Sequence, residues 1–267
     1  MGYSQYRFNL AVIVPGSGVS FVSIDPAEKA ILSLSFPTSL AIRSRSVGEY
    51  SISSLYKLGS YQGEGGEFVR QKIQGFMRVP VPGYLVTGGK VLKAKSSLRL
   101  ALLKKILGRA ETSLSRFDAA LLFYRAGKYS WREVGEDELV RSGVIDSNIY
   151  HPERLQEYVG TRLFDWGIGS SGVTVAIVNA SGENGLGSDM ADFLSNLGLD
   201  VVMVRSASGD ERLESSEWQV GSSDEADELK YIFESLFGLS KPKLEKVPEE
   251  YRSRVLIRVG SDAKELF

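Results

Sequence analysis

The chain contains no cysteine and only one histidine among its 267 residues. It can therefore form neither disulfides nor thiolate metal sites, which fits a cytosolic protein as well as an exported one without bridges. A single imidazole also excludes clusters of histidine ligands. His151 lies in the polar run IYHPERLQEY and no G-x-S-x-G elbow is present, so we interpret it as a surface residue and not as a triad member.

The N-terminal region lacks a long apolar run. Its longest is LAVIV, Leu10 to Val14, which is far short of the ~20 residues that a membrane-spanning helix needs. This run predicts a strand, and neither a membrane anchor nor a signal peptide.

The formal net charge is only -1, but the charge is divided unevenly along the chain. Up to Ser170 there are 22 basic and 15 acidic residues, and after it there are 10 basic and 18 acidic ones. With 43% hydrophobic residues, the chain has enough apolar material for one large or two medium domains. The glycine-rich sequence GIGSSG, Gly167 to Gly172, is the best linker candidate, so we expect domains at 1–168 and 169–267.

The first part of the chain mixes strand and helix patterns. Three strands are expected at 7–14, 18–25 and 29–36, separated by the turn sequences PGSG and DPAE. Short helices at 51–61 and 67–77 and a strand at 83–87 should follow. A further helix at 115–126 has Ser115 as its expected N-cap, and its expected packing residues are Phe117, Leu121, Leu122 and Tyr124.

Seven basic residues and no acidic residue lie between positions 90 and 109. Aliphatic residues are interleaved with them, which predicts a basic amphipathic helix pair or one bent helix. Such a surface suits an anionic partner, such as lipid headgroups, nucleic acid or a polyanionic glycan. The alternative is a solvated cationic face over a leucine core, since no aromatic residues for base stacking are interleaved. The candidate binding residues are Lys90, Lys93, Lys95, Arg99, Lys104, Lys105 and Arg109.

The second part of the chain opens with a βαβ pattern. An apolar strand at 173–178 is followed by a helix, whose inner face carries Leu186, Met190, Phe193, Leu194 and Leu197, and by a strand at 200–204. A polar segment containing Glu217 to Val220 comes next. A helix at 222–238 with a Ser222–Glu225 capping box and a last strand at 255–259, with Val255, Ile257 and Val259 inward, complete the pattern.

A glycine cluster joins the first strand of this pattern to its helix. Glycines 182, 185 and 187 give G-x-x-G-x-G, whereas dinucleotide binding requires G-x-G-x-x-G. Arg205, and not an acidic residue, follows the second strand, so nucleotide binding is disfavoured. The helix amides leave a generic anion site open.

The sequences VNASGENGLGSDMADFLSNLGLDV and RVLIRVGSDA resemble the LytR C-terminal domain. Its strand runs into an Asn-Gly-Thr-Gly-like turn and then a helix, and its last strand ends near Gly-x-Asp. Asn179, Gly182, Gly185, Leu186 and Gly198 match this pattern, while Ala180 and Gly187 depart from it. The resemblance spans 173–267 and identifies Asn179, Gly182 and Gly185 as its motif turn.

Such domains commonly follow a LytR-CpsA-Psr domain, and the first part of the chain is similar to that family over about 8–89. The similar sequences are VSIDPAEKAILSLSFPTSLAI and GEGGEFVRQKIQGFMRVPVPGYLVTGG. The resemblance implies two α/β domains: an N-terminal mixed sheet with helices, and a C-terminal βαβ-αβ domain. Family members are membrane-anchored, Mg²⁺-dependent phosphotransferases that move glycopolymers from a polyprenyl-pyrophosphate carrier to the cell wall.

The family's arginines and acids are missing at the matching positions. Thr38 and Ser39 follow Pro37 where the family has Arg-Asp, and PGSG at 15–18 replaces Arg-Ser-Asp-Thr. Losing arginines that pair with a transferred phosphoryl group costs ~10³-fold or more in rate. We therefore expect no catalytic residue, metal ligand or cofactor. The alternative is a Mg²⁺-dependent transferase in which Arg43, Arg45 and Arg70 substitute.

The resemblance favours a non-catalytic binding or assembly protein of the bacterial envelope, a pseudoenzyme. Its expected partners are an anionic glycopolymer or membrane surface and other envelope proteins. Nucleic acid is not expected, because the acidic second domain would repel the phosphate backbone. An extracytoplasmic location follows from the resemblance alone, with a cytoplasmic one as the alternative, since the family's N-terminal membrane helix is not among these residues.

Overall fold

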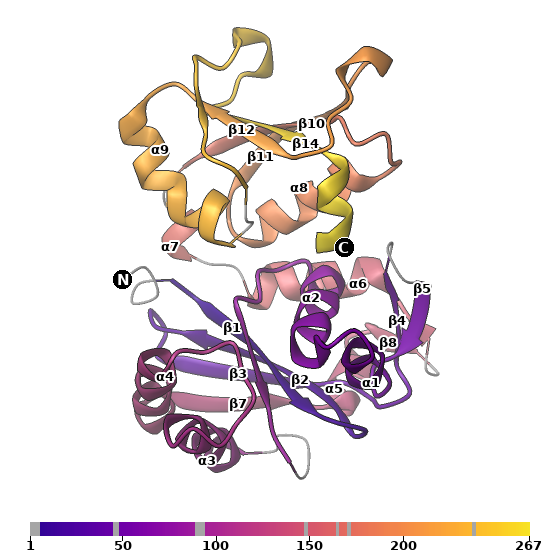
Figure 1. Cartoon of the computed structure of the whole chain (residues 1–267), viewed down its shortest axis with the longest axis vertical. Coiled ribbons are helices and arrows are strands. Elements are labelled where there is room, and N and C mark those ends of the chain that lie inside the picture. The colour runs from indigo at the N-terminus through magenta and orange to yellow at the C-terminus, as the bar shows by residue number, and fades with distance from the viewer. Residues whose placement is uncertain are drawn as a thin grey trace. The chain divides into compact units, whose positions relative to one another are not determined.

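The computed structural model describes residues 6–44, 48–88, 94–146, 149–163, 166–169, 172–236 and 239–267. It divides into two compact units, both mixed α/β as predicted (Figure 1). The first unit holds most of the chain up to Tyr158, and the second holds Val159–Phe267 with Arg78–Pro80. The division falls within helix α6 (Pro152–Arg162), and the sequence-based boundary at 168/169 lies further along the chain.

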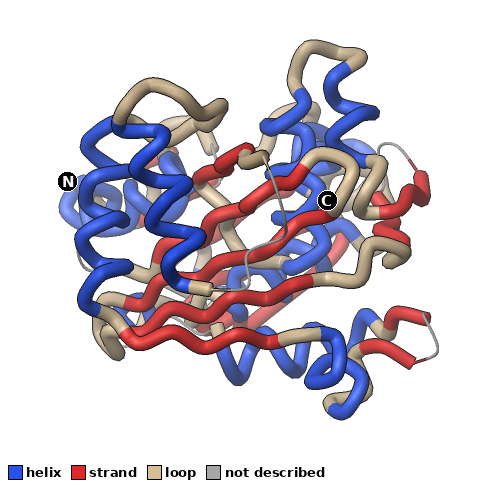
Figure 2. The backbone as a smooth tube through the Cα atoms, turned by 90° about the horizontal axis from the view of Figure 1, so that it is seen from below, coloured by secondary structure: helices blue, strands red, loops and turns tan. Residues whose placement is uncertain are grey.

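The sheet of the first unit has the order β6-β1-β2-β3-β7. The three predicted strands are confirmed as an antiparallel meander of β1 (Phe8–Val14), β2 (Gly18–Asp25) and β3 (Ala30–Ser35). Strand β6 (Gly83–Val86) adds in parallel to β1, and β7 (Ser130–Val134) adds in parallel to β3. Every residue of β1 and β2 is buried, because helices cover both faces of the sheet (Figures 1 and 2).

The helices on the two faces come from different parts of the chain. Helices α3 (Lys95–Ile106) and α4 (Arg116–Lys128) pack on one face through a cluster that includes Leu10 and Leu102. Helix α2 (Gly65–Met77) contacts β1. The smaller elements of the unit are α1 (Leu55–Ser60), α5 (Glu136–Arg141), and the strand pairs β4 (Ala41–Ser44) with β5 (Gly48–Ser51) and β8 (Ile145–Asp146) with β9 (Ile149–Tyr150).

Helix α4 confirms its predicted start and corrects its predicted packing. The Ser115 hydroxyl accepts the amide of Asp118 at 3.0 Å, and the Asp118 carboxylate accepts the amide of Ser115 at 3.2 Å, forming a capping box. The buried stripe consists of Ala119, Leu122, Arg125 and Ala126. Phe117 and Tyr124 lie off this stripe and are 77% and 63% exposed, so their expected role in packing is wrong.

The second unit contains the predicted βαβ motif. Strand β10 (Thr174–Asn179), helix α8 (Leu186–Asn196) and strand β11 (Asp200–Ser206) follow one another, and the two strands pair in parallel. Strand β14 (Val255–Val259) pairs in parallel with the other edge of β10. The sheet order is β11-β10-β14-β12-β13. A short helix, α7 (Trp166–Gly169), precedes this sheet.

The second sheet contains a strand that the sequence pattern missed. The supposedly polar segment at 217–220 is β12 (Glu217–Val220), antiparallel to β14, and β13 (Lys243–Leu244) extends the sheet in parallel. Trp218 is fully buried, donates from Nε1 to the Ser240 carbonyl at 2.7 Å and lies 4.8 Å from the Phe233 ring. A buried indole N–H needs a hydrogen-bond acceptor, and the tertiary fold supplies the Ser240 carbonyl for Trp218.

Strand β14 also differs from its predicted alternation. Leu256 is buried as well as Val255, Ile257 and Val259, because it packs with Ala176, Val178, Val247 and Tyr251 on the other face. A central strand covered on both sides has no outward face. The predicted helix at 222–238 is α9 (Ser223–Lys230), continued by a π-helical segment, Tyr231–Leu236; positions 237 and 238 lie outside the described residues.

The Gly-x-Asp sequence at the end of β14 closes the sheet onto the start of β12. The Asp262 carboxylate accepts the Ser216 amide at 2.9 and 2.8 Å, and Ser216 Oγ accepts the Gly260 amide at 2.9 Å. A Cβ atom added at Gly260 would lie 2.5 Å from the Ser215 carbonyl carbon and 2.7 Å from the Ser216 amide nitrogen. The close approach of two backbones therefore requires glycine here.

We expect Gly260→Ala to destabilise the protein by about 1–3 kcal/mol, because the backbone that the new methyl group meets cannot rotate away. Gly209→Ala is the matched control, since a Cβ atom there has nothing within 4 Å. Urea unfolding followed by circular dichroism measures both free energies. Equal stabilities of the two variants would contradict the close approach at Gly260.

Candidate functional site

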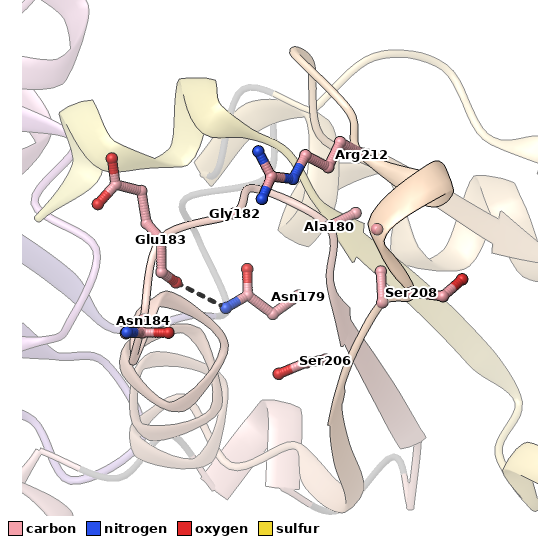
Figure 3. A pocket seen from close by; sticks show the side chains of 10 residues that line it. Asn179, Ala180, Gly182, Glu183, Asn184, Ser206, Ser208 and Arg212 are labelled. Atoms are coloured by element: carbon pink, nitrogen blue, oxygen red, sulfur yellow. Dashed lines mark hydrogen bonds between the residues drawn. The ribbon is translucent and has the colours of Figure 1, made fainter.

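The second unit has a pocket where β10 and β11 end (Figure 3). It encloses about 110 Å³ and is lined by the end of β10 and the loop after it, by residues 206–209 at the end of β11 and just beyond it, and by Arg212. The carboxyl ends of parallel strands are where open α/β sheets place their ligands. The pocket is therefore the candidate site of this unit.

Asn179 fixes the loop that forms one wall of the pocket. Its Nδ2 donates to the Glu183 carbonyl at 2.8 Å, and its Oδ1 accepts the amide and the hydroxyl of Ser181 at 3.2 and 2.6 Å. Ser181 Oγ in turn accepts the Glu183 amide at 3.0 Å. These bonds satisfy backbone groups that a tight turn would otherwise leave unpaired.

The predicted motif turn forms the connection between β10 and α8. Gly182 and Gly185 have φ angles of +78° and +81°, which favour glycine, and Gly185 is the N-cap of α8. A Cβ atom at Gly187 would lie 3.0 Å from Asn179 Cβ and 3.3 Å from Val204 Cγ1, so this glycine lets α8 pack closely on the sheet. All three glycines thus have conformational or packing reasons.

Arg212 supplies the charge of the pocket. Its guanidinium covers Gly182, where a Cβ atom would lie 3.3 Å from both Cζ and Nε. Within the described residues it forms no ion pair or side-chain hydrogen bond. Glu183, the acidic residue of the lining, instead pairs with Lys264 at 3.2 Å, and its side chain points away from Asn179 (Figure 3).

The sequence patterns did not identify Arg212, Ser206 or Ser208. The available signal was their position, because they follow the second strand of a βαβ motif, where ligand-binding loops occur. Arg212 is also one of only ten basic residues after Ser170.

The predicted basic surface is only partly gathered by the structure. Lys90 and Lys93 lie outside the described residues. Lys95 Nζ donates to the Tyr129 carbonyl at 2.6 Å, and the Arg99 guanidinium carbon lies 4.5 Å from the Phe123 ring centroid, so both stabilise the packing of α3 on α4. Lys104, Lys105 and Arg109 form no ion pair within the described part of the chain. The exposed cations therefore concentrate at the end of α3.

The leucines of α3 do not all face the core. Leu98, Ala101 and Leu102 are buried, whereas Leu100, Leu103 and Leu107 are 55%, 39% and 60% exposed. We use the name α3–α4 surface for a set of residues on these two helices and the connection between them, all exposed except Lys105, which is half-buried. It consists of Leu100, Leu103, Lys104, Lys105, Leu107, Arg109, Arg116, Phe117 and Tyr124.

Arg70, one of the arginines considered for a relocated transferase site, is already engaged within the first unit. Arg70 donates to the Glu67 carboxylate, to Gln74 Oε1 at 3.2 Å and to the Val81 carbonyl at 2.7 Å. Arg43 is exposed on β4, and Arg45 lies outside the described residues. No group of three or more histidine, aspartate or glutamate residues within the described ranges could hold a metal ion, and His151 is exposed.

The pKa of one tyrosine in the first unit is raised. The hydroxyl of Tyr56 donates to Glu111 Oε2 at 2.7 Å, and this bond, with burial and the nearby negative charge, raises the pKa of Tyr56 from 10.0 to about 12. Tyr56 is therefore a hydrogen-bond donor at neutral pH and not a general base.

We expect Glu111→Gln to lower the pKa of Tyr56 toward 10.0, because the hydrogen bond to a carboxylate and its charge are both lost. The folded state gains stability from this raised pKa below pH 10 and loses it as pH rises through about 12. NMR titration of ¹³C-labelled tyrosine measures the pKa, with Glu49→Gln as the control. An unchanged pKa in Glu111→Gln would contradict the assignment.

Comparison with known proteins adds two findings. Residues 172–262 match the family model described as "LytR cell envelope-related transcriptional attenuator", the LytR_C family. None of the curated proteins matches the chain.

The solved structures that are similar to this chain include the following three. Bacillus subtilis TagT has 12% identity and a TM-score of 0.41, over 59% of this chain and 90% of its own. The LytR-CPS2A-psr family protein YwtF (TagT) with bound octaprenyl pyrophosphate lipid has 13% identity and a TM-score of 0.40, over 58% and 88%. A transcriptional regulator from Enterococcus faecalis has 12% identity and a TM-score of 0.39, over 73% and 88%. The family model itself covers the chain from before β10 to beyond β14, and the second unit therefore contains a LytR C-terminal domain.

Proposed function

We propose that the protein is a non-catalytic binding or assembly protein of the cell envelope, located outside the cytoplasm. In this proposal a LytR C-terminal domain is joined to a degenerate LytR-CpsA-Psr-like domain. The description of the matched family, which is cell-envelope-related, supports the location. The α3–α4 surface is the observation that carries the binding function. No described helix is both long and apolar enough to cross a membrane.

The charge of the α3–α4 region is not balanced locally. Residues 94–128 include eight basic residues and two acidic ones. Both acids have other partners, because Glu111 accepts the Tyr56 hydroxyl and Asp118 caps α4. The cations at the end of α3 therefore create a positive field that attracts an anionic polymer or an anionic membrane surface.

The apolar part of the α3–α4 surface favours a lipid surface. Leu100, Leu107 and Phe117 are each more than half exposed. Leu100 and Lys104 lie on α3, and Leu107 and Arg109 follow its end directly. Exposed apolar side chains gain free energy when they enter the boundary between headgroups and acyl chains, and nearby cations bind the anionic headgroups. A soluble anionic glycan would use the cations alone.

The geometry of the first unit supports binding without transfer. Transfer from a pyrophosphate carrier requires guanidinium groups that are free to neutralise the leaving phosphate. Arg70, the most buried of the substitute arginines that the structure describes, is occupied by Glu67, Gln74 and Val81.

The protein should bind vesicles that contain phosphatidylglycerol at low ionic strength, and Lys104→Glu/Lys105→Glu/Arg109→Glu should weaken this binding by about 100-fold or more. The control Lys57→Glu/Arg141→Glu/Arg154→Glu changes the net charge equally at exposed positions of the same unit. Vesicle cosedimentation measures both affinities. Binding that is insensitive to salt, or equal in the two variants, would remove the α3–α4 surface from the proposal.

A second pair of variants separates the two anionic partners. Leu100→Gln/Leu107→Gln should weaken vesicle binding and leave binding to a soluble poly(glycerol phosphate) unchanged, because only the bilayer contacts the leucines. Equal loss for both ligands would assign the surface to a polymer instead.

The non-catalytic assignment has its own test. With Mg²⁺ and a polyprenyl-pyrophosphate-linked saccharide, we expect no release or transfer of the saccharide. Transfer by the intact chain that is lost in Arg43→Ala or Arg45→Ala would establish the transferase alternative and overturn the assignment. Mass spectrometry of the lipid and saccharide products gives the measurement.

A further inference from the structure

We propose that the pocket of the LytR C-terminal domain binds a phosphate group at the end of a larger molecule. This site lies in the second unit and is independent of the α3–α4 surface. Its principal ligand-binding residue is Arg212, with the Ser206 hydroxyl as an additional donor; Ser208 also lines the pocket, but its hydroxyl points away from Arg212 (Figure 3).

The first argument is the charge of the pocket. Arg212 has no acidic partner or hydrogen-bond acceptor among the described residues, although 18 acidic residues follow Ser170. The acid that lines the pocket, Glu183, is neutralised by Lys264. Among the side chains that the structure describes, none therefore balances the positive charge of the exposed Arg212, and a guanidinium is the side chain that best matches an oxyanion.

The second argument is the arrangement of the remaining donors. The guanidinium of Arg212 lies beside Gly182 on one side, and Ser206 and Ser208 come from the end of β11 on another (Figure 3). Neither serine hydroxyl forms a hydrogen bond within the described part of the chain, and both serines are exposed. The guanidinium and the Ser206 hydroxyl lie on separate sides of the pocket (Figure 3), and donors from separate directions suit a tetrahedral phosphate better than a planar carboxylate.

The third argument is that the walls of the pocket are fixed before any ligand binds. Asn179 and Ser181 hold the loop through four hydrogen bonds. The bare backbone of Gly182 leaves room for the guanidinium, since a Cβ atom would approach it to 3.3 Å. A preformed site loses less entropy when it binds.

The size of the pocket restricts the ligand. A volume of about 110 Å³ holds a phosphate with ordered water but is too small for a nucleoside. Only a terminal group of a larger molecule would therefore enter, with the rest outside. This agrees with the absence of a dinucleotide glycine pattern.

The test uses the full chain, labelled with ¹⁵N, and inorganic phosphate as the probe at low ionic strength. We expect saturable shifts of the backbone amides of Gly182, Ser206 and Ser208. Arg212→Gln should weaken phosphate binding by about tenfold or more, since a charge-assisted hydrogen bond is lost. Arg252→Gln removes an exposed arginine of the same unit and should bind phosphate as the unchanged protein does.

A second variant guards against misfolding of Arg212→Gln. Ser206→Asp keeps Arg212 but places a carboxylate at the pocket, and it should abolish phosphate binding while the remaining amide spectrum stays native. Unshifted pocket amides, or equal affinity of the Arg212→Gln variant, would overturn the site. Acetate that binds as tightly as phosphate would overturn the preference for a phosphate group. None of these outcomes depends on vesicle binding, so this site and the α3–α4 surface can fail separately.

Discussion

The amide of Asn179 bonds to the chain in two directions at the end of a central strand of the second sheet. This small ring of hydrogen bonds converts the carboxyl end of β10 into a tight loop that starts α8. Gly182 can then approach the guanidinium of Arg212, and Gly187 can pack α8 against Asn179. One asparagine side chain therefore fixes the loop that leads into α8 and lies beside Arg212. Asparagine suits this position because its side-chain amide can form hydrogen bonds with nearby backbone groups.

The two units use their positive charge differently. In the first unit, Arg70 forms intramolecular bonds to the Glu67 carboxylate and to a backbone carbonyl, so its charge is already paired. The cations of the α3–α4 surface instead lie among exposed leucines. In the second unit, acidic residues dominate, and Arg212 lies over a glycine and pairs with no carboxylate among the described side chains. The nearly neutral total charge of the chain hides both features.

Local patterns were sufficient for much of the fold. The meander β1–β3 has turn residues between apolar runs, and the β10–α8–β11 motif has a clear helical period, so both were predictable. Strand β12 was not predictable in this way, because Glu217 and Gln219 make the segment look like a polar loop. Only its pairing with β14 identifies it as a strand. The exposure of Phe117 also depends on tertiary structure, since the stripe that α4 buries is set by the sheet beneath it.

The candidate site divides along the same line. Asn179, Gly182 and Gly185 have conformational signatures that a sequence motif records. Arg212 has none, because its neighbour Gly182 is distant in sequence and the two meet only when β11 pairs with β10. A residue required for a particular backbone angle can be recognised from the sequence, whereas a residue required for a long-range contact is recognised only in the folded structure.

The position of β14 has a consequence for how the second unit assembles. This strand lies between β10 and β12, although it follows both of them in the sequence. During synthesis on the ribosome, the backbone groups of β10 and β12 that face β14 therefore have no strand to pair with until residues 255–259 emerge. The nascent domain is most vulnerable to pairing with other chains in that interval, and the arrival of β14 ends it by filling the gap in a single late step.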